Sequence, residues 1–168
     1  HIWWSDERFV PADSVERNAF PFHGTVVNNK VVVHEALASD VAKSIDEAVA
    51  DYDLALENVD IDLNILGLGP DGHVASLFPG HEHLEGQGLI LAEHDSPKPP
   101  SERLSLSYSV LNTAKEIWFL IAGADKAAPL ATAFSDTPDS LPVGRISGTS
   151  ANRWFIDSAA GASLNQTS

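Results

Sequence analysis

The stretch 40–72 constrains the fold most, because a helix pattern, a strand pattern and a glycine-rich loop follow one another directly. Apolar residues recur at three- and four-residue steps across 40–57, which predicts a helix with Ser39 as its N-cap and an acidic, solvated opposite face. Residues 61–66 have the pattern of a strand, and three glycines follow within the next six positions. This order is typical of a parallel α/β sheet.

The remaining elements fit the same class of fold. The apolar start of the chain and three later runs predict further strands. Two other segments predict further helices, and the first of these helices has a capping-box spacing between Asp13 and Glu16. The predicted strands are 1–4, 104–108, 116–122 and 153–157, the predicted helices are 15–20 and 125–134, residues 80–101 are expected to be loop, and residues 158–168 a frayed tail. We therefore expect an α/β fold in one domain.

Composition excludes several classes of protein. Acidic residues outnumber basic ones by 24 to 10, which argues against sequence-independent nucleic-acid binding. No apolar run reaches the length of about eighteen residues that a membrane helix needs, and we find no signal-peptide pattern. Cysteine is absent, which rules out disulfides and fits a cytoplasmic protein. Methionine is also absent and the chain opens on an apolar strand, so we expect that an N-terminal segment is missing.

The loop after residues 61–66 carries the groups best suited to chemistry. Asp71 and His73 flank Gly72, so a tight turn presents both side chains. An imidazole titrates near neutral pH and can act as a general base, and a nearby carboxylate can orient it. Spacing alone leaves a structural turn about equally plausible. Ser76–Phe78 is expected to form a short helical turn.

A metal site is the alternative use of histidine in this chain. His81 and His83 are two residues apart, and His94 follows later. Alternating histidines on a strand could bind zinc, but the stretch is rich in glycine and has no matched second pair. We therefore predict no metal.

The loop Gly67–Pro79 closely resembles the signature loop of 6-phosphogluconolactonases. Four more blocks resemble segments of that family in the same order and extend the resemblance over roughly residues 1–160. They are Asp6–Pro11 with Asn18, Pro97–Pro100 with Arg103, Gly123 with Lys126 and Ala127, and Trp154 with Asp157. Val74 and Arg17 depart from the residues that are usual there.

The resemblance implies a Rossmann-like, mostly parallel sheet flanked by helices and a cofactor-independent enzyme. Its substrate would be a small sugar-phosphate lactone, 6-phosphoglucono-δ-lactone, hydrolysed to 6-phosphogluconate in the oxidative branch of the pentose phosphate pathway. His73 would be the general base, Asp71 would orient it or contact sugar hydroxyls, and Asp6 would also face the sugar. The expected oxyanion donors are N–H groups near Gly69 or Gly72, and the expected phosphate ligands are Arg8, Arg103 and Lys126, with Lys98 as a fourth candidate.

The family also has an N-terminal portion, with a glycine-rich phosphate-binding loop, that these residues do not match. We therefore expect residues 1–160 to be the C-terminal major part of a single domain and residues 161–168 a flexible tail. The missing segment of the same protein is a candidate partner, and neither nucleic acid nor membrane is expected.

Two other functions stay open. Glucosamine-6-phosphate deaminase/isomerases resemble this chain in the Asp-Gly-His loop, but Ser76–Pro79 and Pro97–Pro100 favour the lactonase. A sugar-phosphate-sensing domain without catalysis is the second alternative. The intact Asp71-Gly72-His73 sequence argues against it, because a sensor needs no base.

Overall fold

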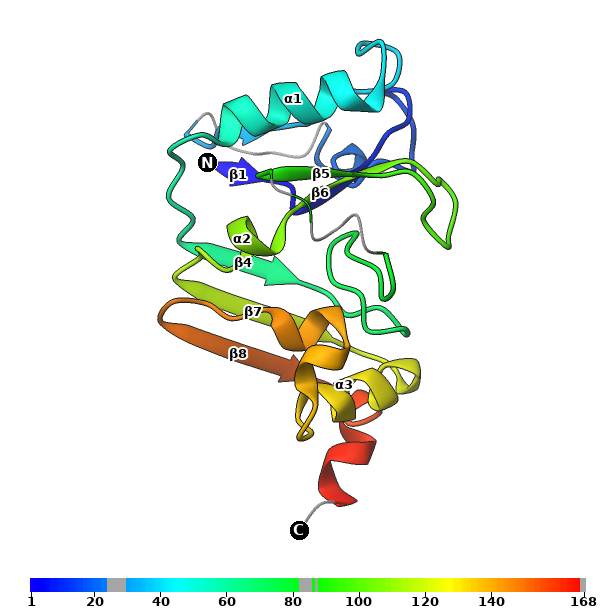
Figure 1. Cartoon of the computed structure of the whole chain (residues 1–168), viewed down its shortest axis with the longest axis vertical. Helices are drawn as coiled ribbons and strands as arrows, with labels where there is room; N and C mark the ends of the chain where they lie inside the picture. Colours follow the sequence, from blue (N-terminus) through cyan, green and yellow to red (C-terminus); the bar gives the residue numbers. More distant parts are fainter. Residues whose placement is uncertain (24–29, 82–85, 87, 167–168) are drawn as a thin grey trace. The chain divides into compact units, whose positions relative to one another are not determined.

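The computed structural model describes residues 1–23, 30–81, 86 and 88–166, which form two compact units (Figure 1). Unit 1 consists of residues 1–59 and 86–106, and unit 2 consists of residues 60–85 and 107–168. The α/β class predicted from the sequence is confirmed, since each unit combines strands with helices. Within the described residues, no helix is long and apolar enough to cross a membrane.

Unit 1 contains two small sheets. Strand β1 (Ile2–Trp3) pairs in parallel with β3 (Val33–His34). Strands β2 (Asp6–Arg8), β6 (Arg103–Leu106) and β5 (Ile90–Glu93) form an antiparallel sheet in the order β2-β6-β5. The predicted loop 80–101 therefore contains a strand, β5, which the surrounding glycines and prolines conceal in the sequence.

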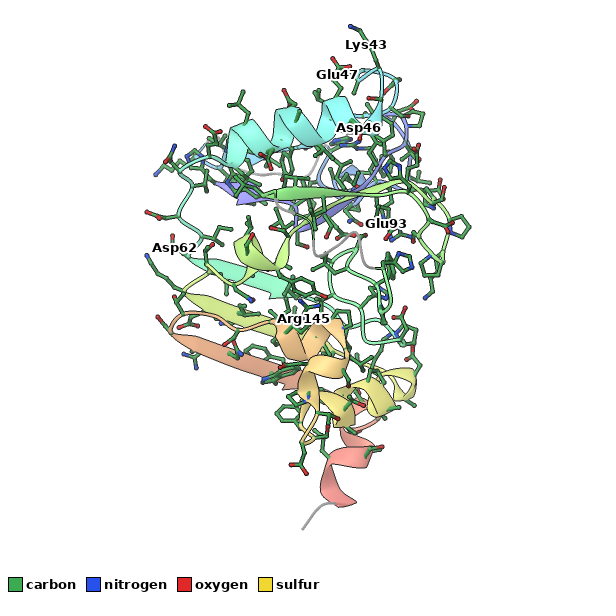
Figure 2. All side chains as sticks on the ribbon, viewed as in Figure 1. Lys43, Asp46, Glu47, Asp62, Glu93 and Arg145 are labelled. Atoms are coloured by element: carbon green, nitrogen blue, oxygen red, sulfur yellow. The ribbon has the colours of Figure 1, made fainter. Side chains whose placement is uncertain are left out.

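Helix α1 (Ile45–Leu56) is shorter than predicted and begins five residues later. Ser44, not Ser39, is the N-cap, because its side chain accepts a hydrogen bond from the Glu47 N–H at 3.2 Å. Val41, assigned to the apolar stripe, is 64% exposed and lies outside the helix. The charged residues near the start of the helix, Lys43, Asp46 and Glu47, are exposed, and the side chains of Lys43 and Glu47 extend outward from it (Figure 2).

The apolar face of α1 packs on the strands of unit 1 through residues spaced three and four apart. Ile45, Ala48, Tyr52 and Leu56 are buried. The Tyr52 hydroxyl accepts a hydrogen bond from the Trp4 N–H at 2.8 Å and lies 3.3 Å from the His34 carbonyl. Burial raises the pKa of Tyr52 well above its usual value. This contact ties the helix to the segments that carry β1 and β3.

The predicted helix over residues 15–20 is wrong. The segment forms turns and then a 3₁₀ helix, η1 (Phe20–Phe22). The reason is Glu7 on β2, which is 1% exposed and accepts hydrogen bonds from three backbone N–H groups. The donors are Arg8 at 2.8 Å, Asn18 at 2.7 Å and Ala19 at 3.0 Å. A helix would use the last two N–H groups for its own ladder, so the buried carboxylate fixes a different backbone path.

Unit 2 is built on a parallel sheet. Strands β4 (Leu63–Leu66), β7 (Glu116–Ile121) and β8 (Ala151–Ile156) lie in the order β4-β7-β8. The other elements of the unit are α2 (Tyr108–Leu111), η3 (Ala124–Lys126), α3 (Ala127–Ala133), η4 (Pro138–Ser140), η5 (Pro142–Arg145) and η6 (Ala160–Gln166). The predicted tail thus includes a 3₁₀ helix, whose Ala160 is fully buried.

Candidate functional site

The loop that follows β4 closes on itself through backbone hydrogen bonds. The Gly69 N–H donates to the His73 carbonyl at 2.8 Å, and the Gly72 N–H donates to the Gly69 carbonyl at 3.0 Å. The chain then reverses at an isolated bridge between Val74 and Leu77. The predicted helical turn at Ser76–Phe78 is therefore wrong, because this tight reversal replaces it. These hydrogen bonds within the loop fix the backbone from which its side chains project.

Asp71 and His73 form a close pair at the tip of this loop. The distance from His73 Nδ1 to Asp71 Oδ1 is 2.5 Å, and the exposed fractions of the histidine and aspartate side chains are 19% and 41%. An ionised carboxylate can only accept, so Nδ1 carries a proton, and in the neutral imidazole Nε2 then has the lone pair. Partial burial raises the pKa of Asp71, but the hydrogen bond and charge of His73 outweigh it and lower that pKa. This is the arrangement of an oriented general base.

Two glycines make the pair possible. A β-carbon at Gly69 would overlap the His73 imidazole, so only glycine lets the ring lie against the backbone there. Gly72 has φ +89°, and a β-carbon there would come within 2.7 Å of Leu141 Cδ1. The Gly72 carbonyl also accepts a hydrogen bond from the Val143 N–H at 3.1 Å. These contacts hold the loop against Leu141 and against η5, which begins at the next residue.

Two of the N–H groups at the expected oxyanion site are engaged within the loop. The N–H groups of Gly69 and Gly72 already donate to carbonyls inside the loop. A developing oxyanion would have to compete with these short bonds, whereas preorganised donors must be ready to bind. The N–H groups of both glycines therefore shape the loop, and the assignment of oxyanion donors near Gly69 or Gly72 stays a prediction.

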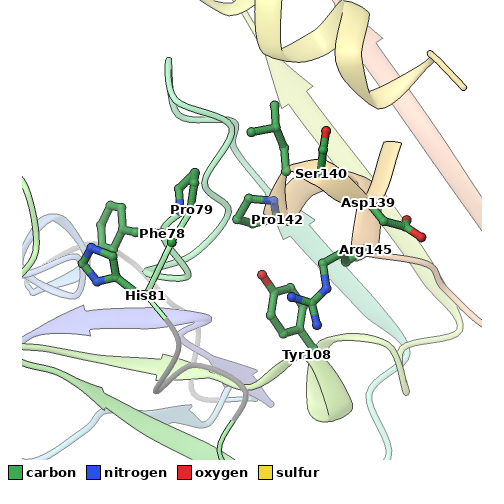
Figure 3. A pocket seen from close by; sticks show the side chains of 10 residues that line it. Phe78, Pro79, His81, Tyr108, Asp139, Ser140, Pro142 and Arg145 are labelled. Carbon is green, nitrogen blue, oxygen red and sulfur yellow. The ribbon is translucent and has the colours of Figure 1, made fainter. Parts of the chain in front are cut away.

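Phe78 lies against His73 and also lines a neighbouring cavity. It is 3% exposed, and its ring centroid lies 4.6 Å from that of His73 and 5.6 Å from that of His81. The cavity beyond it has a volume of about 160 Å³. Its polar lining includes His81, Tyr108 and Arg145, and the Arg145 guanidinium lies 4.1 Å above the Tyr108 ring (Figure 3). Arg145 could not be found from the sequence, since no motif marks it.

Unit 1 gathers three of the predicted substrate ligands on one sheet face. Arg8 on β2 lies directly opposite Arg103 on β6, and Asp6 lies opposite Ser105 on the same pair of strands. Opposite residues in an antiparallel pair point to the same side of the sheet. The Arg8 guanidinium also donates a hydrogen bond to the Glu16 carbonyl at 2.5 Å.

Arg103 also holds the proline-rich loop of unit 1. Its Nε donates to the Pro100 carbonyl at 3.1 Å, and its second terminal nitrogen donates to the Lys98 carbonyl at 2.8 Å. Burial lowers the pKa of Arg103, and the charge of Arg8 adds to this effect. Lys98 takes part in this contact through its backbone carbonyl, and the residue as a whole is exposed. Arg103 thus has a structural role whatever else it binds.

Lys126 lies in unit 2 at the end of η3. Its side chain is 19% exposed and forms an ion pair with Asp125 at 2.8 Å. The predicted residues therefore fall into two groups: unit 2 holds His73, Asp71, the two glycines and Lys126, while unit 1 holds Asp6, Arg8, Lys98 and Arg103. For metals, the described part of the chain shows no cluster of three or more ligands, and His83 lies outside the described residues.

Comparisons with known proteins agree on one family. The family model for glucosamine-6-phosphate isomerases/6-phosphogluconolactonase matches residues 1–155. A 6-phosphogluconolactonase of Streptomyces coelicolor is 36% identical over 97% of this chain and 69% of its own length. The one of Rattus norvegicus is 38% identical over 98% of this chain and 68% of its own length. The crystal structure of the Thermotoga maritima 6-phosphogluconolactonase aligns with a TM-score of 0.81 and 33% identity, covering 93% of this chain and 72% of that one.

Proposed function

The chain belongs to the family of glucosamine-6-phosphate isomerases and 6-phosphogluconolactonases, and from this membership we propose that it hydrolyses 6-phosphoglucono-δ-lactone to 6-phosphogluconate. The observation that carries the proposal is the 2.5 Å pair of His73 and Asp71 on the signature loop. The reaction is that of a carboxylic ester hydrolase in the oxidative branch of the pentose phosphate pathway.

His73 is the general base of the proposed mechanism. With Nδ1–H donating to Asp71, Nε2 removes a proton from a water molecule, and the water oxygen attacks the lactone carbonyl carbon. Asp71 stabilises the imidazolium that forms. When the tetrahedral intermediate collapses, the bond between the carbonyl carbon and the ring oxygen breaks, and Nε2–H protonates that oxygen. The product is the open-chain acid, and the base returns to its neutral form.

Arg8 and Arg103 are the proposed phosphate ligands in unit 1. Two like charges directly opposite on neighbouring strands destabilise a sheet, and a bound dianion would offset that cost. Among the described residues, the buried Nε of Arg8 has no hydrogen-bond partner, so it could donate to a phosphate oxygen. Asp6, next to them on β2, is proposed to face sugar hydroxyls.

Two lysines complete the proposed set of phosphate ligands. Lys126 adds a compact positive charge, and Lys98 is the fourth candidate for the phosphate. No metal or cofactor is required by the mechanism. In the relatives, the polypeptide outside the match with this chain would complete the phosphate pocket. We also propose a cytoplasmic location for the protein.

The direct test is to assay two reactions on the purified chain. Lactone hydrolysis is followed as proton release with freshly prepared 6-phosphoglucono-δ-lactone, above the spontaneous rate. Deamination is followed as ammonia release from glucosamine 6-phosphate. We expect the first activity and not the second. Ammonia release without lactonase activity would establish the deaminase alternative, while 6-phosphogluconate binding without either activity would establish the sensing alternative.

Exchanging Asp71 for asparagine tests the orientation of the base. The amide of the new side chain can donate to Nδ1, which favours the tautomer with the proton on Nε2 and removes the base. We expect kcat to fall by about 10²–10⁴-fold while KM changes little. Steady-state kinetics of Asp71→Asn measure this, with the exposed Asp136→Asn as the matched control. An unchanged kcat would limit Asp71 to a role in the loop.

A further inference from the structure

Asp157 follows β8 directly, and the proposed mechanism gives it no role. Its carboxylate accepts two backbone hydrogen bonds, from the Ala160 N–H to Oδ1 at 2.7 Å and from the Gly123 N–H to Oδ2 at 3.1 Å. Ala160 begins η6, whereas Gly123 lies in the turn after β7. The Asp157 N–H also donates to the carbonyl of Ile121, the last residue of β7, at 3.1 Å. Asp157 therefore fastens the turn that follows the neighbouring strand.

The turn that Asp157 holds carries Lys126. The Gly123 carbonyl accepts a hydrogen bond from the Lys126 N–H at 3.1 Å, so Gly123 joins the two residues through its own backbone. Gly123 has φ +103°, and a β-carbon there would come within 2.8 Å of Asp125 Oδ1. Asp125 in turn binds the Lys126 ammonium at 2.8 Å. The turn thus fixes the lysine at its backbone and contacts the charged end of its side chain.

The turn lies at the end of the sheet where ligands are expected. Strands β4, β7 and β8 run in parallel, so their carboxyl ends lie together (Figure 1). The loop of His73 follows β4, the turn of Lys126 follows β7, and Asp157 follows β8. Open α/β sheets bind ligands beside the carboxyl ends of their strands. Asp157 therefore braces the turn of Lys126 at the end of the sheet that also carries the proposed base.

We infer that Asp157 is a positioning residue, which fixes the turn after β7 so that the Lys126 ammonium is placed for the substrate phosphate. The inference rests on the proposed function, because that function assigns Lys126 to the phosphate. A backbone N–H binds an ionised carboxylate about twice as strongly as it binds a neutral acceptor, so the bond from Gly123 is a firm tie. A lysine side chain binds better from a fixed backbone, since less conformational freedom is lost on binding. An aspartate that only stabilises η6 would not act through Lys126.

A double-mutant cycle separates these two roles. The binding of 6-phosphogluconate is measured by isothermal titration in Lys126→Ala, in Asp157→Ala and in the double variant. We expect Kd to rise about tenfold in Lys126→Ala, the usual scale for a hydrogen bond to a charged group, and at least about fivefold in Asp157→Ala. The double variant should match Lys126→Ala within about twofold, because the aspartate acts through the lysine. In Asp157→Ala, KM should rise while kcat stays within about twofold, because His73 lies on another loop.

Lysine acylation tests the turn without any ligand. The side chain of Lys126 is 19% exposed, whereas that of Lys115 in the same unit is 62% exposed. Brief treatment with acetic anhydride, followed by peptide mass spectrometry, measures the acylation rate at each lysine. We expect Asp157→Ala to loosen the turn and raise the rate at Lys126 at least about threefold, with Lys115 unchanged. Asp136→Ala, the same change at another exposed aspartate of unit 2, should alter neither rate.

Two results would overturn the inference: losses of affinity that multiply in the double variant, or an unchanged acylation rate at Lys126 in Asp157→Ala. A wild-type chain that binds no 6-phosphogluconate would contradict the proposed function instead, and acylation would still decide whether Asp157 fixes the turn. If Asp157→Ala does not fold, Asp157→Asn takes its place, since its amide keeps the size of the side chain but offers a single acceptor atom.

Discussion

Replacing His73 by alanine is expected to lower kcat for lactone hydrolysis at least about a hundredfold, the usual contribution of a general base. The structural reason is that Asp71 binds His73 Nδ1 and leaves Nε2 available, so that the neutral imidazole can accept a proton there. Because the base acts on water and not on the sugar, KM should stay within a few fold. Steady-state kinetics with purified variants measure both constants.

The control for this substitution is His94→Ala. His94 is an exposed histidine of unit 1 that lies 3.7 Å from the Glu102 carboxylate, so its loss should leave kcat unchanged. A fall of less than tenfold in His73→Ala, with the fold intact by circular dichroism, would remove His73 from the role of base. Full loss in both variants would point to a general loss of structure instead.

Replacing Glu7 by alanine is expected to lower the free energy of unfolding by about 3–5 kcal/mol. The carboxylate accepts from the N–H groups of Arg8, Asn18 and Ala19, and it lies 3.8 Å from Arg17 Nε, whose side chain is also buried. Alanine would leave these donors buried without an acceptor. Since domains are stable by only about 5–15 kcal/mol, this is a large fraction of the total.

Urea denaturation followed by tryptophan fluorescence tests this, because Trp3 and Trp4 report on unit 1. Glu16→Ala makes the same chemical change at an exposed position close in sequence and should cost less than about 0.5 kcal/mol. Equal midpoints for the two variants would show that Glu7 does not hold this region. The result also bears on function, because Glu7 lies between Asp6 and Arg8 on β2.

Local patterns predicted the elements that are long and bounded by clear signals. Strands β4, β7 and β8 coincide with the apolar runs expected there, and α3 follows η3 within the predicted helix 125–134. The predictions failed where a distant residue decides the backbone path. Residues 15–20 look helical by capping pattern, yet Glu7 draws the N–H groups of Asn18 and Ala19 out of any ladder. No local pattern contains that contact.

The candidate site divides in the same way. The adjacency of Asp71 and His73 could be predicted, because two residues around one glycine must lie close together. The pairing of Arg8 with Arg103 could not be derived from spacing, because it depends on the register of β2 against β6 across 95 positions of sequence. The internal use of the Gly69 and Gly72 N–H groups was also hidden, since a sequence does not show which carbonyl a loop amide will meet.

The packing of His73 against Phe78 gives the proposed base a spectroscopic signal of its own. With ring centroids 4.6 Å apart and planes inclined at 51°, the carbon-bound protons of His73 lie within the ring current of Phe78. The chain has seven histidines, and this neighbour gives His73 a magnetic environment that differs from that of an exposed imidazole. Its proton resonances, assigned by comparison with His73→Ala, can therefore report the protonation of this imidazole directly, in solution and without substrate.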